Sequence, residues 1–228
     1  GAYITMMPAE YILAAIPLNI MNAIIISTIL IPIKITPQED VIVSVSSPDS
    51  AEAAVEGAKP KKEPFFSFLS DSILAAGKLI LIIIASVIAF VALVALIDNA
   101  MILIHKDFSL ENILGVLMFP FAWLLGFDPA EAFNLGRFMG TKIITNEFVV
   151  MVQVKDVLGS YSPHFRAVLT VFLTSFANFS TVGMIIGCLK GLVNKEKNDA
   201  VSKSIGKMLF SGIFVSLLSA AFVGLFVW

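Results

Sequence analysis

The sequence contains little charge and a single cysteine, and each shortage excludes a class of protein. Only 14% of the 228 residues are Asp, Glu, Lys or Arg, whereas about 25% is usual for a soluble domain. Cys188 alone excludes a disulfide framework or a thiolate metal cage within the chain. The formal net charge of −2 provides no basic field, so nucleic acid is not an expected partner.

Hydrophobic residues take the place of the missing charge. They make up 58% of the chain, and the mean hydropathy is +0.93. So few charged residues do not cover the surface of a soluble domain, and the composition therefore indicates a protein of the lipid bilayer. The sequence has no Gly-rich phosphate loop, no Ser/His/Asp set and no cluster of metal ligands. We therefore expect no enzyme activity and no cofactor.

Three segments are apolar enough to cross the bilayer as helices, which takes about 20 residues. They cover residues 11–32, 73–97 and 205–228. The segment between the first two is rich in Pro, Ser and charge and is typical of a solvated loop. The chain is thus predicted to have four parts: a spanning helix with its preceding residues (1–33), a cytoplasmic loop (34–64), a spanning helix with an interfacial segment (65–108) and a less regular membrane part (109–228).

The last part is predicted to contain two irregular elements at membrane depth. Two short apolar arms, 109–127 and 138–154, flank a polar stretch at 128–137 and indicate a re-entrant hairpin over 109–155. A broken helix over 164–190 follows, because small and polar residues gather at 174–183, and the last spanning helix covers 205–228. The fold class is therefore all-α: a polytopic membrane protein with spanning helices, a re-entrant helical hairpin and a broken helix. Lysines at 190–207 place that loop in the cytoplasm.

Glu147 is the most informative residue, because a carboxylate within the membrane costs roughly 2.5–3.5 kcal/mol and seldom persists without a partner or a function. Asn146 beside it adds two donors and an acceptor. Together they could bind a polyol, with the carboxylate accepting hydroxyl hydrogens. The alternative is a structural ion pair with Lys142, although a separation of five residues is off the favoured helical spacing.

The stretch SFANFST at 175–181 is the second candidate. Asn178, Ser180 and Thr181 offer hydrogen bonds, while Phe176 and Phe179 offer flat apolar faces. Stacking combined with a few oriented hydrogen bonds suits a base or a sugar ring. The alternative is close packing of helices through small residues.

Other polar and aromatic residues are interpreted as marks of the membrane surface. Arg137 would end the second hairpin arm, His105 would lie in an interfacial stretch, and His164 would lie in a loop after a Ser-Pro pair. Trp123 and Trp228 are typical of lipid-facing or aromatic-belt positions.

These stretches resemble the concentrative nucleoside transporter family. The matching segments are GTKIITNEFVV (140–150), Ser162-Pro163, VFLTSFANFSTVG (171–183), FPFAWLLGF (119–127) and GAYITMMPAEYILAA (1–15). The resemblance implies a homotrimeric symporter of the bacterial inner membrane, which moves nucleosides inward with a Na⁺ or H⁺ gradient by an elevator-like motion. It also implies that residues 109–228 are a transport-domain half, that Glu147 holds ribose hydroxyls and that Phe176, Asn178 and Thr181 line the nucleoside site.

The chain departs from the family pattern in one large respect. The family's first hairpin, which reads the base, and its first broken helix, which supplies the ion site, have no counterpart here. We therefore expect the C-terminal half, with the ribose side of the site and with the co-transported ion bound outside this chain. The alternative is a truncated membrane gate or scaffold that transports nothing, in which Glu147 pairs with Lys142.

Overall fold

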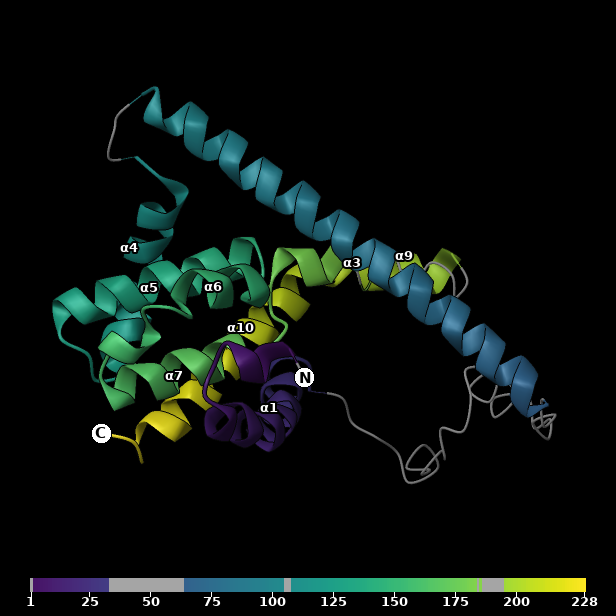
Figure 1. Ribbon diagram of the computed structural model, residues 1–228, viewed down its shortest axis with the longest axis horizontal. Helices are drawn as coiled ribbons and strands as arrows, with labels where there is room; N and C mark the ends of the chain where they lie inside the picture. Colours follow the sequence, from purple (N-terminus) through teal and green to yellow (C-terminus); the bar gives the residue numbers. More distant parts are fainter. Residues whose placement is uncertain (1, 33–63, 105–107, 184, 186–194) are drawn as a thin grey trace.

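The computed structural model describes residues 2–32, 64–104, 108–183, 185 and 195–228. Within these ranges the chain is helical and forms no strand, which confirms the predicted all-α class. Figure 1 shows a packed bundle and one long helix, α3, that extends along its outside. The elements are η1 (Ala2–Thr5), α1 (Ala9–Leu30), α3 (Phe65–Ile102), α4 (Leu110–Leu124), α5 (Pro129–Ile144), α6 (Glu147–Val154), η2 (Leu158–Ser160), α7 (Pro163–Leu173), α9 (Lys195–Lys203) and α10 (Ile205–Gly224).

Helices α1 and α10 are each long and apolar enough to cross a membrane, with 22 and 20 residues. They coincide with the first and third predicted spans, and they pack against each other. At their contact the buried amide of Asn22 donates to the Ser219 hydroxyl at 2.9 Å. Such polar links between apolar helices are typical of membrane bundles, because lipid offers a polar side chain no other partner.

Helix α3 contains the second predicted span and is much longer than it. Its 38 residues extend about 57 Å at 1.5 Å per residue. Large apolar side chains along it are exposed, including Ile73, Ile88 and Leu96. Asp98 near its end accepts a hydrogen bond from the backbone N–H of Leu110 and so links α3 to the start of α4.

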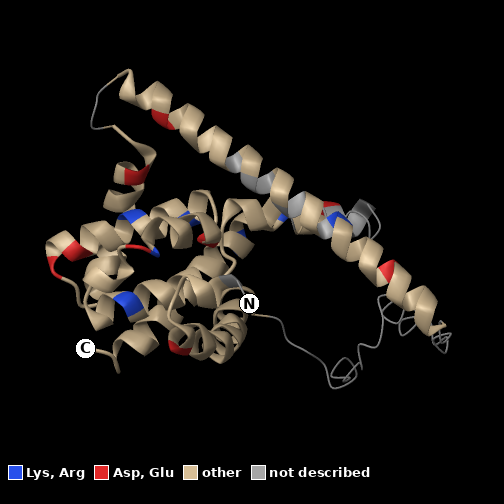
Figure 2. Ribbon diagram, in the orientation of Figure 1, with Lys and Arg blue, Asp and Glu red and all other residues tan. Residues whose placement is uncertain are grey.

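The distribution of charged residues agrees with a membrane protein. Figure 2 shows that most of the ribbon, α3 included, carries neither Lys, Arg, Asp nor Glu. The centre of the hydrophobic core lies where α5, α6 and α7 meet. Its largest apolar members are Leu135, Met139, Met151, Phe165 and Phe172.

Helices α4 and α5 form a tight pair with a short connection. The Asp128 carboxylate caps α5 by accepting from the N–H groups of Ala130 and Glu131, and Pro129 occupies the first turn. Gly126 precedes this cap with a φ of +96°, a backbone conformation that favours glycine. On α5, a Cβ at Gly136 would lie 2.8 Å from a carbonyl oxygen of α4, so glycine permits the close approach.

The structure shortens the predicted tip of the hairpin. Residues 129–137, which were predicted as part of a polar tip, belong to α5, because Asp128 and Pro129 start a helix there. The chain reverses at residues 125–128, so α4 and α5 lie antiparallel, with Gly136 beside Gly115. A second reversal follows at Thr145 and Asn146, which we call the α5–α6 turn. Asn134 near the start of α5 donates to the Tyr161 hydroxyl beyond α6 at 2.9 Å, so α6 returns alongside α5.

The predicted interruption of the following helix is present. Helix α7 ends at Leu173, residues 174–178 are not helical, and residues 179–183 are helical again. We call residues 174–178 the α7 break. The rest of the predicted broken helix and nearly all of the predicted loop at 34–64 lie outside the described residues, as does His105.

Candidate functional site

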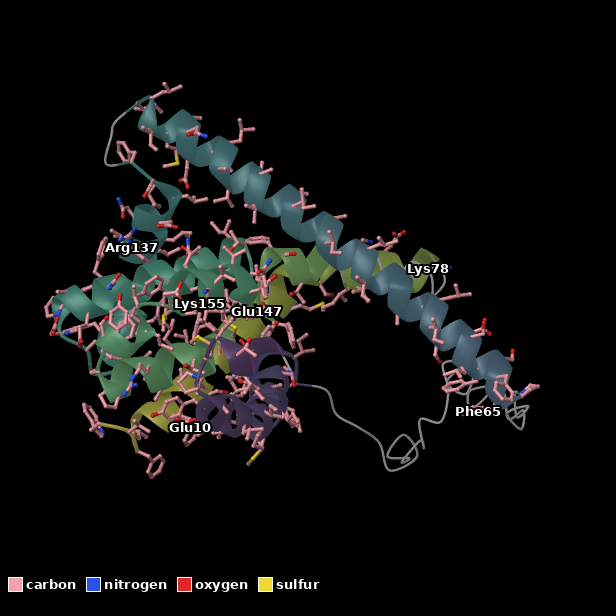
Figure 3. The ribbon with its side chains drawn as sticks, viewed as in Figure 1. Glu10, Phe65, Lys78, Arg137, Glu147 and Lys155 are labelled. Carbon is pink, nitrogen blue, oxygen red and sulfur yellow. The ribbon has the colours of Figure 1, made fainter. Side chains whose placement is uncertain are left out.

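The α5–α6 turn and the α7 break meet inside the bundle. Glu147 is the first residue of α6, and Asn178 is the last residue of the break. The Asn178 amide donates to Glu147 Oε2 at 2.8 Å, and both side chains are buried. Figure 3 shows Glu147 near the middle of the bundle, whereas the labelled Phe65 and Lys78 lie on α3 outside it.

Asparagine caps the helix that follows each interruption. The Asn146 side-chain oxygen accepts from the Val149 N–H at 3.0 Å, and the Asn178 oxygen accepts from the Thr181 N–H at 2.7 Å. Both contacts satisfy a free N–H of a helix start. Two positive helix ends therefore begin at the site, and Glu147 in the first turn of α6 is favourably placed for them.

The second oxygen of the Glu147 carboxylate also has a neutral partner. Tyr3, in the short helix η1, donates its hydroxyl to Glu147 Oε1 at 2.7 Å. The sequence analysis missed Tyr3 as a site residue. The two residues lie 144 positions apart, and local spacing carries no signal over such a distance.

Two predicted site residues carry buried polar atoms without a hydrogen-bond partner among the described residues. These atoms are Nδ2 of Asn146 and Oγ of Ser180, whose side chains are 5% and 1% exposed. Leaving a buried donor or acceptor unpaired costs about 1–3 kcal/mol. Buried polar atoms are normally hydrogen-bonded, so an unpaired one is a candidate contact for a ligand.

The predicted apolar face is accessible. Phe176 in the α7 break is 59% exposed and lies beside a cavity of about 740 Å³ between α1, the break and α10. Asn178 and Thr181 line the same cavity, whereas Asn146, Glu147 and Ser180 do not. Its volume falls within the range of roughly 300–1,000 Å³ that is usual for small-molecule sites.

Lys142 does not form the alternative ion pair with Glu147. Its side chain is fully buried, and Nζ contacts the hydroxyls of Ser175 and Ser216 at 2.9 and 3.3 Å. No carboxylate of the described residues forms an ion pair with it. Hydroxyls inside the bundle bind the ammonium, so it does not reach the surface.

His164 and Arg137 differ from their predicted surroundings. His164 is a buried residue of α7 rather than a loop residue, and its ring nitrogens lie 2.7 and 3.0 Å from the carbonyl oxygens of Val227 and Leu125. The exposed Trp228 ring stacks on it. Arg137 lies in the middle of α5 and forms a partly exposed ion pair with Glu111 of α4 at 3.0 Å. Both therefore hold elements of the bundle together.

Comparison with known proteins gives a family match over most of the chain. The model for the "Na+ dependent nucleoside transporter C-terminus" matches residues 11–224. The purine nucleoside transport protein NupG of Bacillus subtilis is 42% identical over 228 residues, which cover 100% of this chain and 54% of that protein. The nucleoside permease NupC of Helicobacter pylori is 35% identical over 153 residues, which cover 63% of this chain and 36% of that protein.

Solved structures show the same similarity. A variant of CNTnw in an outward-facing state superimposes with a TM-score of 0.72 at 26% identity, covering 98% of this chain and 52% of that one. A variant of CNTnw in an intermediate state gives a TM-score of 0.71 at 27% identity, covering 98% and 54%. The chain therefore spans about half the length of these proteins.

Proposed function

Because the chain belongs to the Na⁺-dependent nucleoside transporter family and is therefore a membrane protein, we propose that it supplies the ribose-binding half of a nucleoside symporter. The observation that carries the proposal is the contact between Glu147 and Asn178 across two helix interruptions. Transporters commonly build substrate sites from such discontinuous helices, whose positive ends and freed backbone groups face the ligand.

The Glu147 carboxylate is the proposed ribose ligand. Its present partners, the Tyr3 hydroxyl and the Asn178 amide, are neutral donors at 2.7 and 2.8 Å. Ribose hydroxyls are donors of the same kind, and each carboxylate oxygen has a second lone pair for them. A buried carboxylate held by neutral donors can therefore accept the hydroxyl hydrogens of a polyol as well.

The other predicted residues complete the site in this proposal. The free amide hydrogens of Asn146 and the free hydroxyl of Ser180 bind acceptor and donor atoms of the nucleoside. Phe176 packs its exposed ring against the nucleoside, and Thr181 lines the wall beside it. The base is read by a part of the transporter outside this chain, as the family resemblance implies.

The remaining properties rest on the family. We propose inward symport with Na⁺ or H⁺ as the co-transported ion, bound outside this chain, and a homotrimer in the inner membrane of a bacterium. The elevator-like motion would carry the bundle of α1, α4, α5, α6, α7 and α10 as one unit. The gate or scaffold alternative relied on an ion pair between Lys142 and Glu147, and that pair does not form.

The test uses a chimera that joins this chain to the remainder of the Bacillus subtilis relative. Uptake of radiolabelled adenosine and uridine is measured in cells that lack their own nucleoside carriers. Glu147→Gln is expected to reduce uptake at least about 100-fold, because an amide removes the charge-assisted hydrogen bonds to ribose. Glu10→Gln, at an exposed carboxylate of α1, is the matched control and should retain uptake.

Membrane insertion of each variant is measured alongside. Normal uptake by an inserted Glu147→Gln variant would refute the role of Glu147. Uptake by this chain alone would refute the view that both halves are needed. If neither the chain nor the chimera takes up either nucleoside, the scaffold alternative is favoured.

A further inference from the structure

A buried lysine beside the site has no role in the function proposed so far. Lys142 lies in the last turn of α5 and is 0% exposed. Burial of a charged ammonium costs several kcal/mol unless other groups replace its water. The replacement groups come from three separate elements, and this arrangement indicates a built cation site.

Two hydroxyls and one aromatic ring surround the ammonium. Ser175 of the α7 break and Ser216 of α10 lie 2.9 and 3.3 Å from Nζ, and the Phe172 ring centroid lies 4.6 Å away. The two hydroxyls also contact each other, and each lies near a backbone carbonyl that can take its hydrogen, Gly212 for Ser216 at 2.8 Å and Phe172 for Ser175 at 3.3 Å. An ammonium only donates, so both serine oxygens accept from it.

Helix ends add a favourable field. Lys142 occupies the C-terminal turn of α5, and its ammonium contacts residues at the C-terminal end of α7. The C-terminal end of a helix carries partial negative charge and stabilises a cation. In transporters, such ends of interrupted helices coordinate the mobile cation.

The site also joins the two interruptions that hold Glu147. Lys142 precedes the α5–α6 turn by three residues, while Ser175 lies within the α7 break. Glu147, also buried, lies directly after the turn, and no direct ion pair joins it to Lys142. In a low-dielectric interior, two opposite charges on either side of one turn stabilise each other without direct contact.

We propose that Lys142 is a resident cation: its ammonium fills a monovalent-cation site between α7, its break and α10, and thereby positions Glu147 for the ribose. The part of this inference that concerns ribose rests on the proposed function. A lysine bound in this way fixes the turn against the break permanently. The half of the transporter in this chain then needs no mobile ion of its own.

The first experiment is a double-mutant cycle on the full chain, measured as thermal unfolding in detergent. Lys142→Met keeps the side-chain length but removes the charge, and leaves the Glu147 carboxylate buried without compensation. We expect a large fall in Tm for Lys142→Met alone and a much smaller additional fall in a Glu147→Gln background. Equal falls in Tm in both backgrounds would show that Lys142 does not compensate the charge of Glu147. The control is Lys155→Met, at an exposed lysine paired with Asp156.

The second experiment measures adenosine and uridine affinity in the chimera. Lys142→Met should weaken binding at least about tenfold, and Ser216→Ala, which removes one oxygen from the ammonium, should weaken it several-fold. If Lys142→Met does not fold, Ser216→Ala alone decides the matter. Affinity within twofold of the parent for Ser216→Ala would refute the positioning role.

Chemical rescue tests the cation site itself. Lys142→Ala leaves a space lined by Ser175, Ser216 and Phe172, and added methylammonium should restore part of the lost Tm, whereas methanol should not. Absence of rescue by methylammonium would count against a cation site. If the parent chimera binds neither nucleoside, the proposed function fails, while the Tm cycle and the rescue still test Lys142.

Discussion

The α5–α6 turn and the α7 break use the same device to restart a helix but differ in what remains available for a ligand. Asn146 and Asn178 each cap the following helix with the side-chain oxygen. The amide of Asn178 is engaged by Glu147, whereas the amide of Asn146 has no partner among the described residues. The break therefore orients the carboxylate, and the turn provides an unused donor.

The two interruptions also differ in length and exposure. The turn consists of Thr145 and Asn146, both buried, whereas the break covers residues 174–178 and exposes Phe176. A two-residue turn fixes the direction of its side chains, while a longer segment can present an aromatic face beside a cavity. The unpaired buried amide therefore belongs to the turn, and the exposed aromatic ring belongs to the break.

Asn178 should show the largest effect, because it both caps a helix and holds Glu147. Asn178→Asp keeps the capping oxygen but loses the amide hydrogens and places a second carboxylate against Glu147. Adenosine and uridine affinity in the chimera should fall at least about 100-fold, since removing the donor and adding like charge each cost more than 1.4 kcal/mol. Binding within tenfold of the parent would show that the break does not orient the carboxylate.

Asn146 should show a smaller effect that separates its two roles. Asn146→Ser keeps a capping oxygen for α6 but removes the free amide donor, so affinity should fall about tenfold with little change in Tm. Asn146→Ala loses the cap as well and should lower stability by about 1 kcal/mol. Calorimetric titration and thermal unfolding measure the two quantities. Unchanged affinity in Asn146→Ser would mean that the free amide serves no ligand.

The fold could be predicted from sequence where one pattern dominated. Long apolar runs located α1 and α10, and the small polar residues at 174–183 located the α7 break. The hairpin tip was predicted too long, because Asp128 begins a polar stretch that starts a helix. The second reversal carries only Thr145 and Asn146, too short a signal to distinguish from an interrupted arm.

The site was predictable only in part for a related reason. Glu147 is conspicuous as a carboxylate in an apolar segment, and the family resemblance joined it to Asn178. Contacts of Tyr3 with Glu147 and of Lys142 with Ser216 connect residues 144 and 74 positions apart. Helical or strand spacing encodes no such contact, because tertiary packing alone decides which distant elements meet.

A substitution of Tyr3 should have the smallest effect on nucleoside affinity. It tests the other oxygen of the Glu147 carboxylate, the one that Asn178 does not contact. Tyr3→Phe removes the hydrogen bond to Glu147 Oε1 while keeping the ring packed. One hydrogen bond is worth about 0.5–1.5 kcal/mol, so loosening of the carboxylate should weaken nucleoside binding about threefold. The matched control is Tyr11→Phe, on α1. Tighter binding in Tyr3→Phe would instead show that the tyrosine hydroxyl occupies a lone pair that ribose needs, and Asn178 would then be the only group that orients Glu147.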